Sequence, residues 1–454
     1  MRTLTKLAAG TALVLTMAAT ANAGGFQRGT ADTDILFERG SFSTRTGLTY
    51  VNPNRGFTSV NGVSVDGGDY TGNYQIPSAS VMFGGDAFAC AGHYTESFAA
   101  EADYRGLPGA ALPEFSGQPG ITSRTQTIEF DSNEFGATCR VSYTAEAGRF
   151  SLLGGVFFED FNFQGTSLGE RSLNPALAAA SPVLAGLLAA TGSTVFLPSA
   201  VSVDSRGGYE AGYRVGLAYE RPEIALRIQG LYRSEVEHDS IRGDGQVTIT
   251  DTALVRRGDQ VLTIPTAFGP AFGAGISGAL AGRVPPAGAV IPVESALNTA
   301  ISPQSFTLSA QTGIAEGTLL LASLRWTDWS TNGTVVSTIS SAALGTSSTI
   351  QPYNWRDGYT ASLGLGRAFN ETVAGSISIG YDRGVSTGSD TTYTDLYTVS
   401  GGISLRQSFA ELRLGGLVGY WTDGEQRRSD GAYFDATVGD DWVYGANASL
   451  KFTF

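Results

Sequence analysis

Few residues of this chain have side chains suited to acid–base or nucleophilic chemistry. Its 454 residues include two histidines, His93 and His238, and two cysteines. A lipid-hydrolysing enzyme would need a serine nucleophile and a base that a third group orients, but the sequence around neither histidine supplies such a set. Phosphate-binding loops, CxxC pairs and HExxH sequences are absent from the chain. We therefore find no catalytic residues and expect a protein that is not an enzyme and binds no cofactor.

One acidic run around His238 has residue types that bind divalent cations. Glu235, Glu237 and Asp239 alternate along the chain, so they would lie on the same side of a β-strand. Carboxylate oxygens are suitable ligands for a hard cation, although charged side chains usually lie in solvent. We favour a solvated acidic rim and expect no metal site.

Cys90 and Cys139 are the remaining reactive pair. In a protein exported to an oxidising compartment, an even number of cysteines suggests a disulfide. Two free buried thiols are the alternative, because the spacing in the sequence does not establish the geometry that a bond needs. A disulfide here would join two structural elements and have no catalytic role.

Export is indicated by the first residues of the chain. Arg2 and Lys6 flank the start of an apolar stretch at 7–19, and an Ala-Asn-Ala sequence ends at Ala23. This pattern predicts a cleaved signal peptide at 1–23, with a retained N-terminal anchor as the alternative. The formal net charge of −13 argues against nucleic acid as a partner, because phosphate contacts need a basic surface.

The composition favours many short strands over membrane-spanning helices. The chain contains 60 glycines, 10% aromatic residues and 16% charged residues, which suits β-strands joined by turns. Beyond the signal peptide, the best candidate for a membrane helix is 176–190. Ser181 and Pro182 interrupt it, and it is shorter than the ~20 residues that a membrane helix needs.

The last ten residues alternate in polarity with the two-residue period of a β-strand. One face is apolar throughout, and the other carries polar residues and glycine. Such a strand suits the wall of a transmembrane barrel, with lipid on one side and a polar lumen on the other. The apolar face carries Ala446, Ala448, Leu450, Phe452 and Phe454.

About fourteen strands are predicted, and the connections between them differ in length on the two sides. The connections after even strands are tight, whereas those after odd strands are longer, and two are very long, at about 167–199 and 244–303. Short periplasmic turns and long external loops are typical of bacterial outer-membrane barrels. On this map Cys90 and Cys139 lie on neighbouring strands 3 and 4. The strands are predicted near 40–51, 74–83, 86–104, 124–146, 149–166, 200–220, 223–243, 304–314, 317–340, 347–368, 372–384, 393–407, 410–423 and 441–454.

We therefore predict an all-β fold, a transmembrane antiparallel β-barrel of about 14 strands at 40–454 in the bacterial outer membrane. Residues 24–39 would form a short N-terminal plug, because they lack strand periodicity but carry apolar side chains that solvated tails rarely have. The two long extracellular loops would be partly helical, because their apolar residues repeat at three- and four-residue steps.

Apolar side chains in the long loops and the plug are the candidate binding residues for a hydrophobic solute. Extracellular loops are usually polar, and exposed apolar patches often mark binding sites. Packing of the loops on each other as a lid is the alternative. The candidates are Leu184, Leu187 and Leu188 in the first loop; Phe268, Phe272, Ile276 and Leu280, which would share one helix face, in the second; and Phe26, Leu36 and Phe37 in the plug.

Two stretches resemble the FadL-type family of outer-membrane fatty acid transporters. The first begins with the Pro-x-Ser of Pro303–Ser305 and ends with RWTDWS at Arg325–Ser330, which is similar to the family's W-T-x-W-S strand end. The second is NWRDGY at Asn354–Tyr359. The family's N-terminal hatch is longer and carries an Asn-Pro-Ala motif before the first strand, whereas the Asn-Pro-Ala of this chain, Asn174–Ala176, lies in a loop.

The resemblance implies a channel for passive uptake of hydrophobic molecules, with long-chain fatty acids as the first choice of substrate. Apolar extracellular loops would capture the substrate, a lumen site at the plug would receive it, and a gap in the wall near strand 3 would release it. We expect the break in strand 3 at Gly92, beside Ala89 and Ala91, since glycine marks bulges; an uninterrupted strand is the alternative. Expected partners are outer-membrane lipid, lipopolysaccharide and the assembly machinery, and the chain is expected to be a monomer.

Two other functions are weighed against this one. A general hydrophilic porin would need an open polar lumen, and a surface-exposed barrel, either an adhesin or a lipid-hydrolysing enzyme, would act at its extracellular side. The apolar loops and the family resemblance favour the hydrophobic channel.

Overall fold

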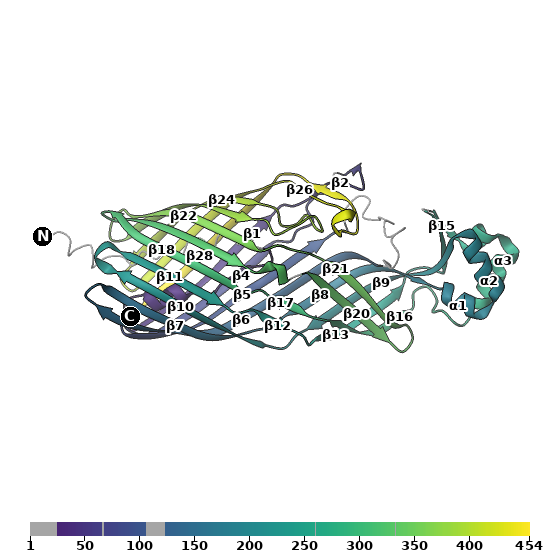
Figure 1. The fold of residues 1–454 in the computed structure, drawn as a ribbon, viewed down its shortest axis with the longest axis horizontal. Helices are drawn as coiled ribbons and strands as arrows, with labels where there is room; N and C mark the ends of the chain where they lie inside the picture. Colours follow the sequence, from purple (N-terminus) through teal and green to yellow (C-terminus); the bar gives the residue numbers. More distant parts are fainter. Residues whose placement is uncertain (1–24, 66–67, 106–122, 259, 332) are drawn as a thin grey trace.

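The computed structural model describes residues 25–65, 68–105, 123–258, 260–331 and 333–454. The predicted signal peptide at 1–23 lies outside these residues. Strands make up most of the described chain and form an elongated barrel whose long axis is horizontal in Figure 1. No helix in the described ranges is long and apolar enough to cross a membrane.

Fourteen transmembrane strands form a closed antiparallel barrel, which confirms the predicted fold class. The last strand pairs with the first, from Ser43↔Thr453 to Pro53↔Val443. Several strands continue past a break as further segments, so that one strand carries two or three labels. In chain order they are β1 (Phe42–Pro53), β4 (Tyr74–Gly84), β5 (Phe88–Asp103), β6 (Ser123–Ala145), β7 (Gly148–Glu159) with β8 (Asn162–Ser172), β9 (Ser193–Arg206) with β10 (Glu210–Arg221), β11 (Leu226–Arg233) with β12 (Val236–His238) and β13 (Ile241–Ile249), β16 (Val290–Leu297) with β17 (Ala300–Ser302) and β18 (Ser305–Ala315), β19 (Thr318–Thr327) with β20 (Thr334–Ser341), β21 (Gly345–Pro352) with β22 (Gly358–Ala368), β23 (Val373–Arg383), β24 (Leu396–Gln407), β25 (Ala410–Trp421) and β28 (Asp441–Thr453).

Side chains alternate between the lumen and the outer surface, as the two-residue period of a strand requires. On β28, Trp442 and Leu450 are exposed on the outside, whereas Val443 and Lys451 are buried on the inside. The alternation predicted for the last strand is therefore present, with its apolar face outward.

Exposed aromatic residues form two belts around the outer surface. Aromatic belts flank the apolar band of outer-membrane barrels, so the wall between them is the part that faces hydrocarbon. We call the belt on the side of the short turns the periplasmic belt and the other the extracellular belt. The extracellular belt includes Tyr50, Tyr94, Phe135, Tyr213, Tyr359, Tyr397, Tyr420 and Trp442, and the periplasmic belt includes Phe83, Phe88, Tyr143, Phe150, Phe369, Phe409 and Phe454.

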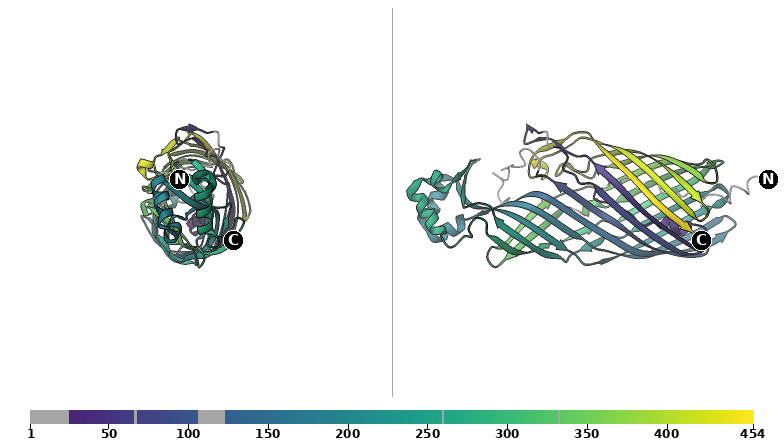
Figure 2. Two further views of the ribbon diagram at one scale, coloured as in Figure 1. Left: turned by 90° about the vertical axis from the view of Figure 1, so that its right-hand side faces the viewer. Right: turned by 180° about the vertical axis from the view of Figure 1, so that it is seen from behind.

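At the extracellular end, one side of the wall is longer than the other. The segments β8, β9, β13, β16, β20 and β21 extend it, and they carry a helical cap beyond the rim (Figure 1). Viewed along the barrel, the helices of this cap lie in front of the barrel (Figure 2). The cap consists of α1 (Asn174–Ala180), α2 (Pro182–Thr191), β14 (Leu254–Arg257), β15 (Gln260–Thr263) and α3 (Ile264–Leu280).

The long loops predicted at 167–199 and 244–303 have strands at both of their ends. The ladder between β9 and β13 runs as far as Ser199↔Ile249, because both strands keep their alternation of side chains beyond the membrane-facing band. Sequence alternation is the same above and below the belts, so it did not show where the membrane ends.

A second, four-stranded sheet lies at the extracellular end of the wall, and Arg55 connects it to the barrel. The Arg55 guanidinium is fully buried and donates to the carbonyl oxygens of Thr391 and Thr422, at 3.0 and 2.9 Å. It also donates to the hydroxyl of Thr394 at 2.7 Å and to the carboxylate of Asp441 at 3.1 Å. One side chain therefore ties together several segments that are distant in the sequence. The small sheet contains β2 (Phe57–Val60), β3 (Val63–Ser64), β26 (Gly424–Gln426) and β27 (Ala436–Val438).

The N-terminal segment lies inside the barrel and fills its periplasmic end, as predicted for a plug. The 3-10 helix η2 (Thr33–Phe37) packs its apolar residues against inward-facing side chains of β4, β5, β7 and β10. Next to it, the carboxylate of Glu38 pairs with Arg45 and with Lys451, each at 2.9 Å. The two ion pairs of Glu38 thus bind the plug to both strands of the closing seam, β1 and β28.

We predict that Arg55→Ala loosens the extracellular sheet without opening the barrel. The substitution leaves buried carbonyl groups and Asp441 without their donor, which should cost about 3 kcal/mol. Limited proteolysis should then cut the extracellular loops faster, while the shift in gel mobility on heating, which reports the folded barrel, stays unchanged. Arg427→Ala removes a more exposed arginine of the same region and should have no effect; equal proteolysis of both variants would contradict the prediction.

Candidate functional site

The helical cap is held together by its own apolar core. Leu184, Leu188, Ile276 and Leu280 are all less than 8% exposed and pack into one cluster with residues of β9, β13, β14 and β16. Four of the candidate binding residues from the loops are therefore used for packing the loops on each other. Leu187, on α2 beside Leu184 and Leu188, is half-buried.

Helix α3 does not present the single apolar face that the four-residue spacing predicts. Gly269 has a left-handed backbone (φ 75°) and Pro270 follows it, so the helix is broken there. Phe268 lies before the break and is half-buried against the cap core, whereas Phe272 lies after it and is 49% exposed. A Gly-Pro pair disrupts a helix, because glycine adopts conformations outside the helical region and proline lacks the amide donor.

An apolar chamber lies inside the extended wall. It has a volume of about 340 Å³, and its lining combines inward-facing valines of β9, β13, β16 and β20 with threonines and serines of β6, β8, β20 and β21 and with Glu170 and Arg171. These residues were not predicted as site residues from the sequence, although Val201 and Val203, two positions apart and so on one face of a strand, were a usable signal. The apolar lining includes Val201, Val203, Val247, Val293, Val335, Ile339 and Leu344.

A cluster of aromatic rings follows the chamber along the lumen, and Phe26 is at its centre. Phe163 and Tyr353 line the chamber and also pack against this cluster, so the two are continuous. The Phe26 ring lies 4.5 Å from Trp355, centroid to centroid. Phe26 is thus the candidate from the plug that lies on the path through the lumen. Its other ring neighbours, at 4.6 to 6.0 Å, are Phe130, Trp329, Tyr353 and Tyr393.

An extracellular carboxylate holds the ring of Trp355 in place. The indole N–H of Trp355 donates to Asp390, which also accepts from the hydroxyl of Ser386 and the backbone N–H of Thr392. Burial raises the pKa of the Asp390 carboxyl. The three donors converge on this side chain and fix its position, so it can orient the indole from outside the membrane-facing band.

A second cavity, of about 390 Å³, lies between the aromatic cluster and the plug helix. Six arginines and three carboxylates line it, so its lining carries a formal excess of positive charge. The side chains of Arg28, Arg45, Arg325 and Gln229 line this cavity, and each has one polar atom that is buried without a hydrogen-bond partner. The excess of positive charge suits ordered water or an anionic group in the cavity. The charged lining residues are Arg28, Arg45, Arg214, Arg227, Arg233, Arg325, Asp32, Asp34 and Glu134.

Leu36 and Phe37 of the plug line neither cavity. Both are buried in the plug core, and the guanidinium groups of Arg140 and Arg227 lie 4.9 and 4.7 Å from the centre of the Phe37 ring. Each of these cations is attracted to the aromatic ring and helps to hold it. The structure thus gives these two candidates an anchoring position.

The wall is incomplete between β4 and β5. In the described chain their ladder ends at Ser78↔Thr95, although β4 continues to Tyr74 against β1 and β5 continues to Asp103 against β6. The register of β5 shifts by one residue between Glu96 and Phe98, which makes a bulge at Ser97.

The bulge is not at Gly92, where the break in this strand was expected. Gly92 pairs regularly with Val81 on β4 and with Ala137 on β6. Glycine permits a bulge but does not require one. In β5 the bulge lies instead at Ser97, where hydrogen bonds from residues outside the β5–β6 ladder hold the backbone.

Residues Phe26–Gly29, which we call the latch, occupy the free edge of β5. The backbone N–H groups of Arg28 and Gly29 donate to the carbonyl oxygens of Ser97 and Glu96, both at 2.8 Å, and the Ala99 N–H donates to Phe26 at 3.0 Å. On the other side of the gap, the Arg28 guanidinium lies 3.8 Å above the ring of Tyr74 on β4. The latch therefore bridges the two strands where they are not paired with each other.

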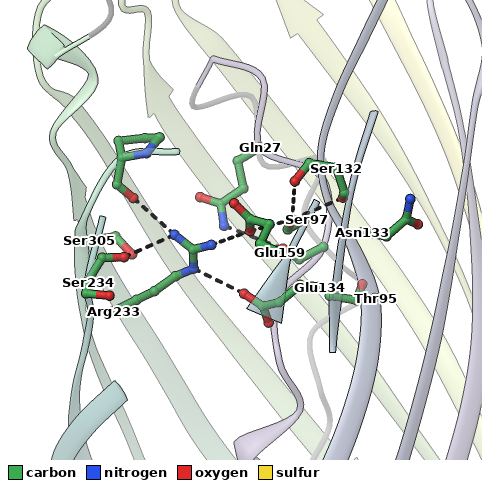
Figure 3. A network of polar contacts seen from close by, with 12 residues as sticks. Gln27, Thr95, Ser97, Ser132, Asn133, Glu134, Glu159, Arg233, Ser234 and Ser305 are labelled. Carbon is green, nitrogen blue, oxygen red and sulfur yellow. Dashed lines mark hydrogen bonds and ion pairs between the residues drawn. The ribbon is translucent and has the colours of Figure 1, made fainter. Parts of the chain in front are cut away.

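A chain of buried ions holds the bulge from inside (Figure 3). The hydroxyl of Ser97 donates to Glu159 Oε2 at 2.7 Å and contacts the carbonyl oxygen of Ser132 at 3.1 Å. Arg233 pairs with both Glu159 and Glu134, and all three side chains are buried. The bulged residue is thus bound to Glu159 at the end of β7, two strands along the wall, and through Glu159 to Arg233 at the end of β11.

The two histidines lie at the ends of this ion chain. His93 Nε2 is 3.2 Å from Glu134, and His238 Nε2 is 3.5 Å from Glu159. The serine hydroxyl here donates to the carboxylate and not to a histidine nitrogen, an order that differs from a Ser–His–acid triad. Among the described residues, no group of three or more His, Cys, Asp or Glu side chains could hold a metal ion. The acidic run predicted as a solvated rim, Glu235, Glu237 and Asp239, is exposed.

Comparison with known proteins identifies the fold. No family model matches the sequence. No curated protein matches it either. Among solved structures, a Pseudomonas aeruginosa FadL homologue superposes with a TM-score of 0.63 at 15% identity, over 96% of this chain and 97% of that one. The Pseudomonas putida toluene transporter TodX superposes with a TM-score of 0.61 at 14% identity, and the Ralstonia pickettii toluene transporter TbuX with a TM-score of 0.57 at 10% identity. Both superpositions cover 96% of this chain and 98% of the other. The chain therefore has the FadL-type barrel fold.

We predict that Ser97→Ala loosens the latch. The substitution removes the donor that binds the bulge to Glu159, and an unmet buried hydrogen bond costs about 1–3 kcal/mol. Amide hydrogen exchange at Arg28, Gly29 and Ala99 should therefore become roughly tenfold faster or more. Ser142→Ala, which breaks a hydroxyl pair with Ser151 elsewhere in the wall, should leave these amides unchanged. Unchanged exchange in the Ser97 variant would show that the bulge does not depend on this bond.

Proposed function

We propose that this protein is an outer-membrane channel of FadL type that takes up hydrophobic compounds passively, with long-chain fatty acids as its main substrates. The observation that carries the proposal is the continuity of the apolar chamber with the aromatic cluster around Phe26. This apolar route begins under the extracellular cap and leads toward a plugged periplasmic end and an incomplete side wall.

Binding along this route needs no chemical reaction. Removing apolar surface from water is worth about 25 cal/mol per Å², or about 0.8 kcal/mol for each buried methylene. An alkyl chain therefore gains affinity step by step as it passes from the chamber to the aromatic rings. Release through the wall at the latch delivers the chain to hydrocarbon without exposing it to water again.

The cap is the proposed place of first capture. Its core is closed, so the residues available to a solute are its outer ones. Val183, Val261 and Phe272 are 68%, 45% and 49% exposed. These side chains form the apolar surface that a solute meets before it reaches the chamber.

The arginine-rich cavity favours a substrate with an acidic head group. Arg325 lines this cavity, its guanidinium lies 3.5 Å from the hydroxyl of Ser305, and its Nε atom is buried without a hydrogen-bond partner. A carboxylate in this cavity would gain charge-assisted hydrogen bonds. A fatty acid would then place its head group here and its chain among the aromatic rings.

A second candidate function is the uptake of neutral monoaromatic compounds. Two of the similar structures are described as toluene transporters, and the rings around Phe26 form a site suited to a small aromatic molecule. A hydrophilic pore is less well supported than either of these two functions, because the plug and the aromatic cluster both lie across the lumen.

Filling the chamber should slow uptake of both substrate classes. We expect Val203→Trp, which places a large ring in the 340 Å³ chamber, to lower the uptake of labelled oleate and of labelled toluene at least about tenfold. Val63→Trp, on the exposed strand β3 of the small extracellular sheet, is the matched control for side-chain size. Both variants should assemble normally, as judged by heat-modifiable mobility. Normal uptake by an assembled Val203 variant would rule out the chamber as the route.

Arg325→Gln separates the two candidate substrates. If the cavity binds a carboxylate, uptake of oleate should fall roughly tenfold, while uptake of toluene should stay within about twofold of that of the unmodified protein. Dose-dependent uptake by intact cells, with the amount of folded barrel measured in the same samples, checks this. Equal losses for the two compounds, or none for oleate, would contradict recognition of an acidic head group.

A further inference from the structure

The disulfide between Cys90 and Cys139 lies on the outer surface of the barrel. The two residues are direct partners in the ladder between β5 and β6 and are bonded to each other. Their sequence neighbours Ala89, Ala91 and Arg140 are buried on the inside, against or next to the plug. Because side chains alternate along a strand, both sulfur atoms point away from the lumen.

The bond also lies between the two aromatic belts. Along β6, Phe135 of the extracellular belt and Tyr143 of the periplasmic belt are each four residues from Cys139. Along β5, Phe88 of the periplasmic belt is two residues from Cys90, and Tyr94 of the extracellular belt is four residues from it. In the folded, inserted barrel the disulfide therefore faces hydrocarbon.

Thiol oxidation does not suit this location. Disulfide formation by exchange requires a thiolate as the attacking group, and an apolar medium strongly disfavours a charged sulfur atom. The oxidants of the periplasm are also dissolved in water. Two cysteines that have entered the membrane as thiols thus lack both the reactive form and the reagent.

We propose that a periplasmic thiol–disulfide oxidant forms the Cys90–Cys139 bond before the barrel enters the membrane. In this step the two thiols lose two protons and two electrons, a sulfur–sulfur bond forms between them, and the disulfide of the oxidant is reduced to two thiols. The hairpin of β5 and β6 is then already linked when the wall is assembled. The proposal depends on the barrel being inserted in a membrane and not on which solute it carries.

A disulfide formed early would stabilise β5 while one of its edges is still unpaired. Between Glu96 and Ala99, β5 pairs with the latch and not with β4, so in this part β6 is its only paired strand of the wall. During assembly, before the plug is in place, that edge has no partner. A covalent link near the base of β5 keeps the strand in register with β6 through this stage.

A pulse-chase experiment on the full-length protein tests the order of events. Cells are pulse-labelled in the presence of dithiothreitol, chased until heat-modifiable mobility shows folded barrel, and then freed of reductant. Free thiols are counted by alkylation after denaturation. We expect folded barrel that was made reduced to stay reduced after dithiothreitol is removed, while untreated cells contain oxidised chains before any folded ones. A chain that remains unfolded until the reductant is removed would equally support the order, because oxidation then precedes folding.

A second pair of cysteines provides the control. The hydroxyls of Thr58 and Thr437 lie 2.9 Å apart on the exposed extracellular sheet. In a protein with Cys90→Ser, Cys139→Ser, Thr58→Cys and Thr437→Cys, the new pair faces water and should oxidise after folding, at least roughly a hundredfold faster than the native pair in folded barrel. Folded, reduced native protein that oxidises as fast as this control would overturn the proposal.

Discussion

In hydrocarbon no water is present to pair with backbone groups, so each strand of the wall must find its hydrogen-bond partners within the protein. The fourteen strands meet this requirement by closing β28 onto β1. The exception is the upper part of β5, whose edge does not pair with β4. The latch supplies partners at Glu96–Ala99, and residues 70–72 supply them beyond it, where the Gly72 N–H donates to Glu101 and the Asp103 N–H donates to Tyr70. The latch is thus part of the plug in the lumen and also pairs with the wall as a short strand would. A change in the plug therefore also changes the wall at this point.

The contacts that hold the bulge and those that hold the latch differ in kind. Ser97 is bound to Glu159, whose charge is balanced by Arg233. Removing one partner of a buried ion pair is strongly destabilising, because it leaves the other charge buried without compensation. The latch is held by three backbone hydrogen bonds, one stacked arginine and the ring of Phe26. The bulge is therefore held more strongly than the latch. Such a difference is expected where a segment opens locally while the strands around it stay folded.

The sequence predicted the parts of this fold that repeat and missed those that depend on a single contact. Two-residue alternation and the asymmetry of the connections were sufficient for the strand number and for the order around the barrel. They did not place the bulge, because Ser97 is set by Glu159, 62 residues away, and nothing in the local sequence marks that contact. The apolar residues of the loops were found, but their burial depends on which loop packs on which. The break in α3 was readable from Gly269 and Pro270 alone, whereas the four-residue spacing concealed it. Phe26 was found by its apolar character in a plug, but its ring neighbours come from strands far apart in the chain.

The order of environments along the lumen constrains how an amphiphilic solute would pass. The apolar chamber comes first, the aromatic cluster next and the arginine-rich cavity last. A fatty acid that binds its head group to Arg325 leaves its chain among the rings, beside the latch, because Phe26 belongs to both. The apolar chain is then the part nearest to the gap between β4 and β5, which the latch and the Arg28–Tyr74 contact bridge. Under the proposed function, movement of the latch would admit the chain to the bilayer before the head group leaves the arginines, and the charged group would cross last, when the chain already provides the driving force.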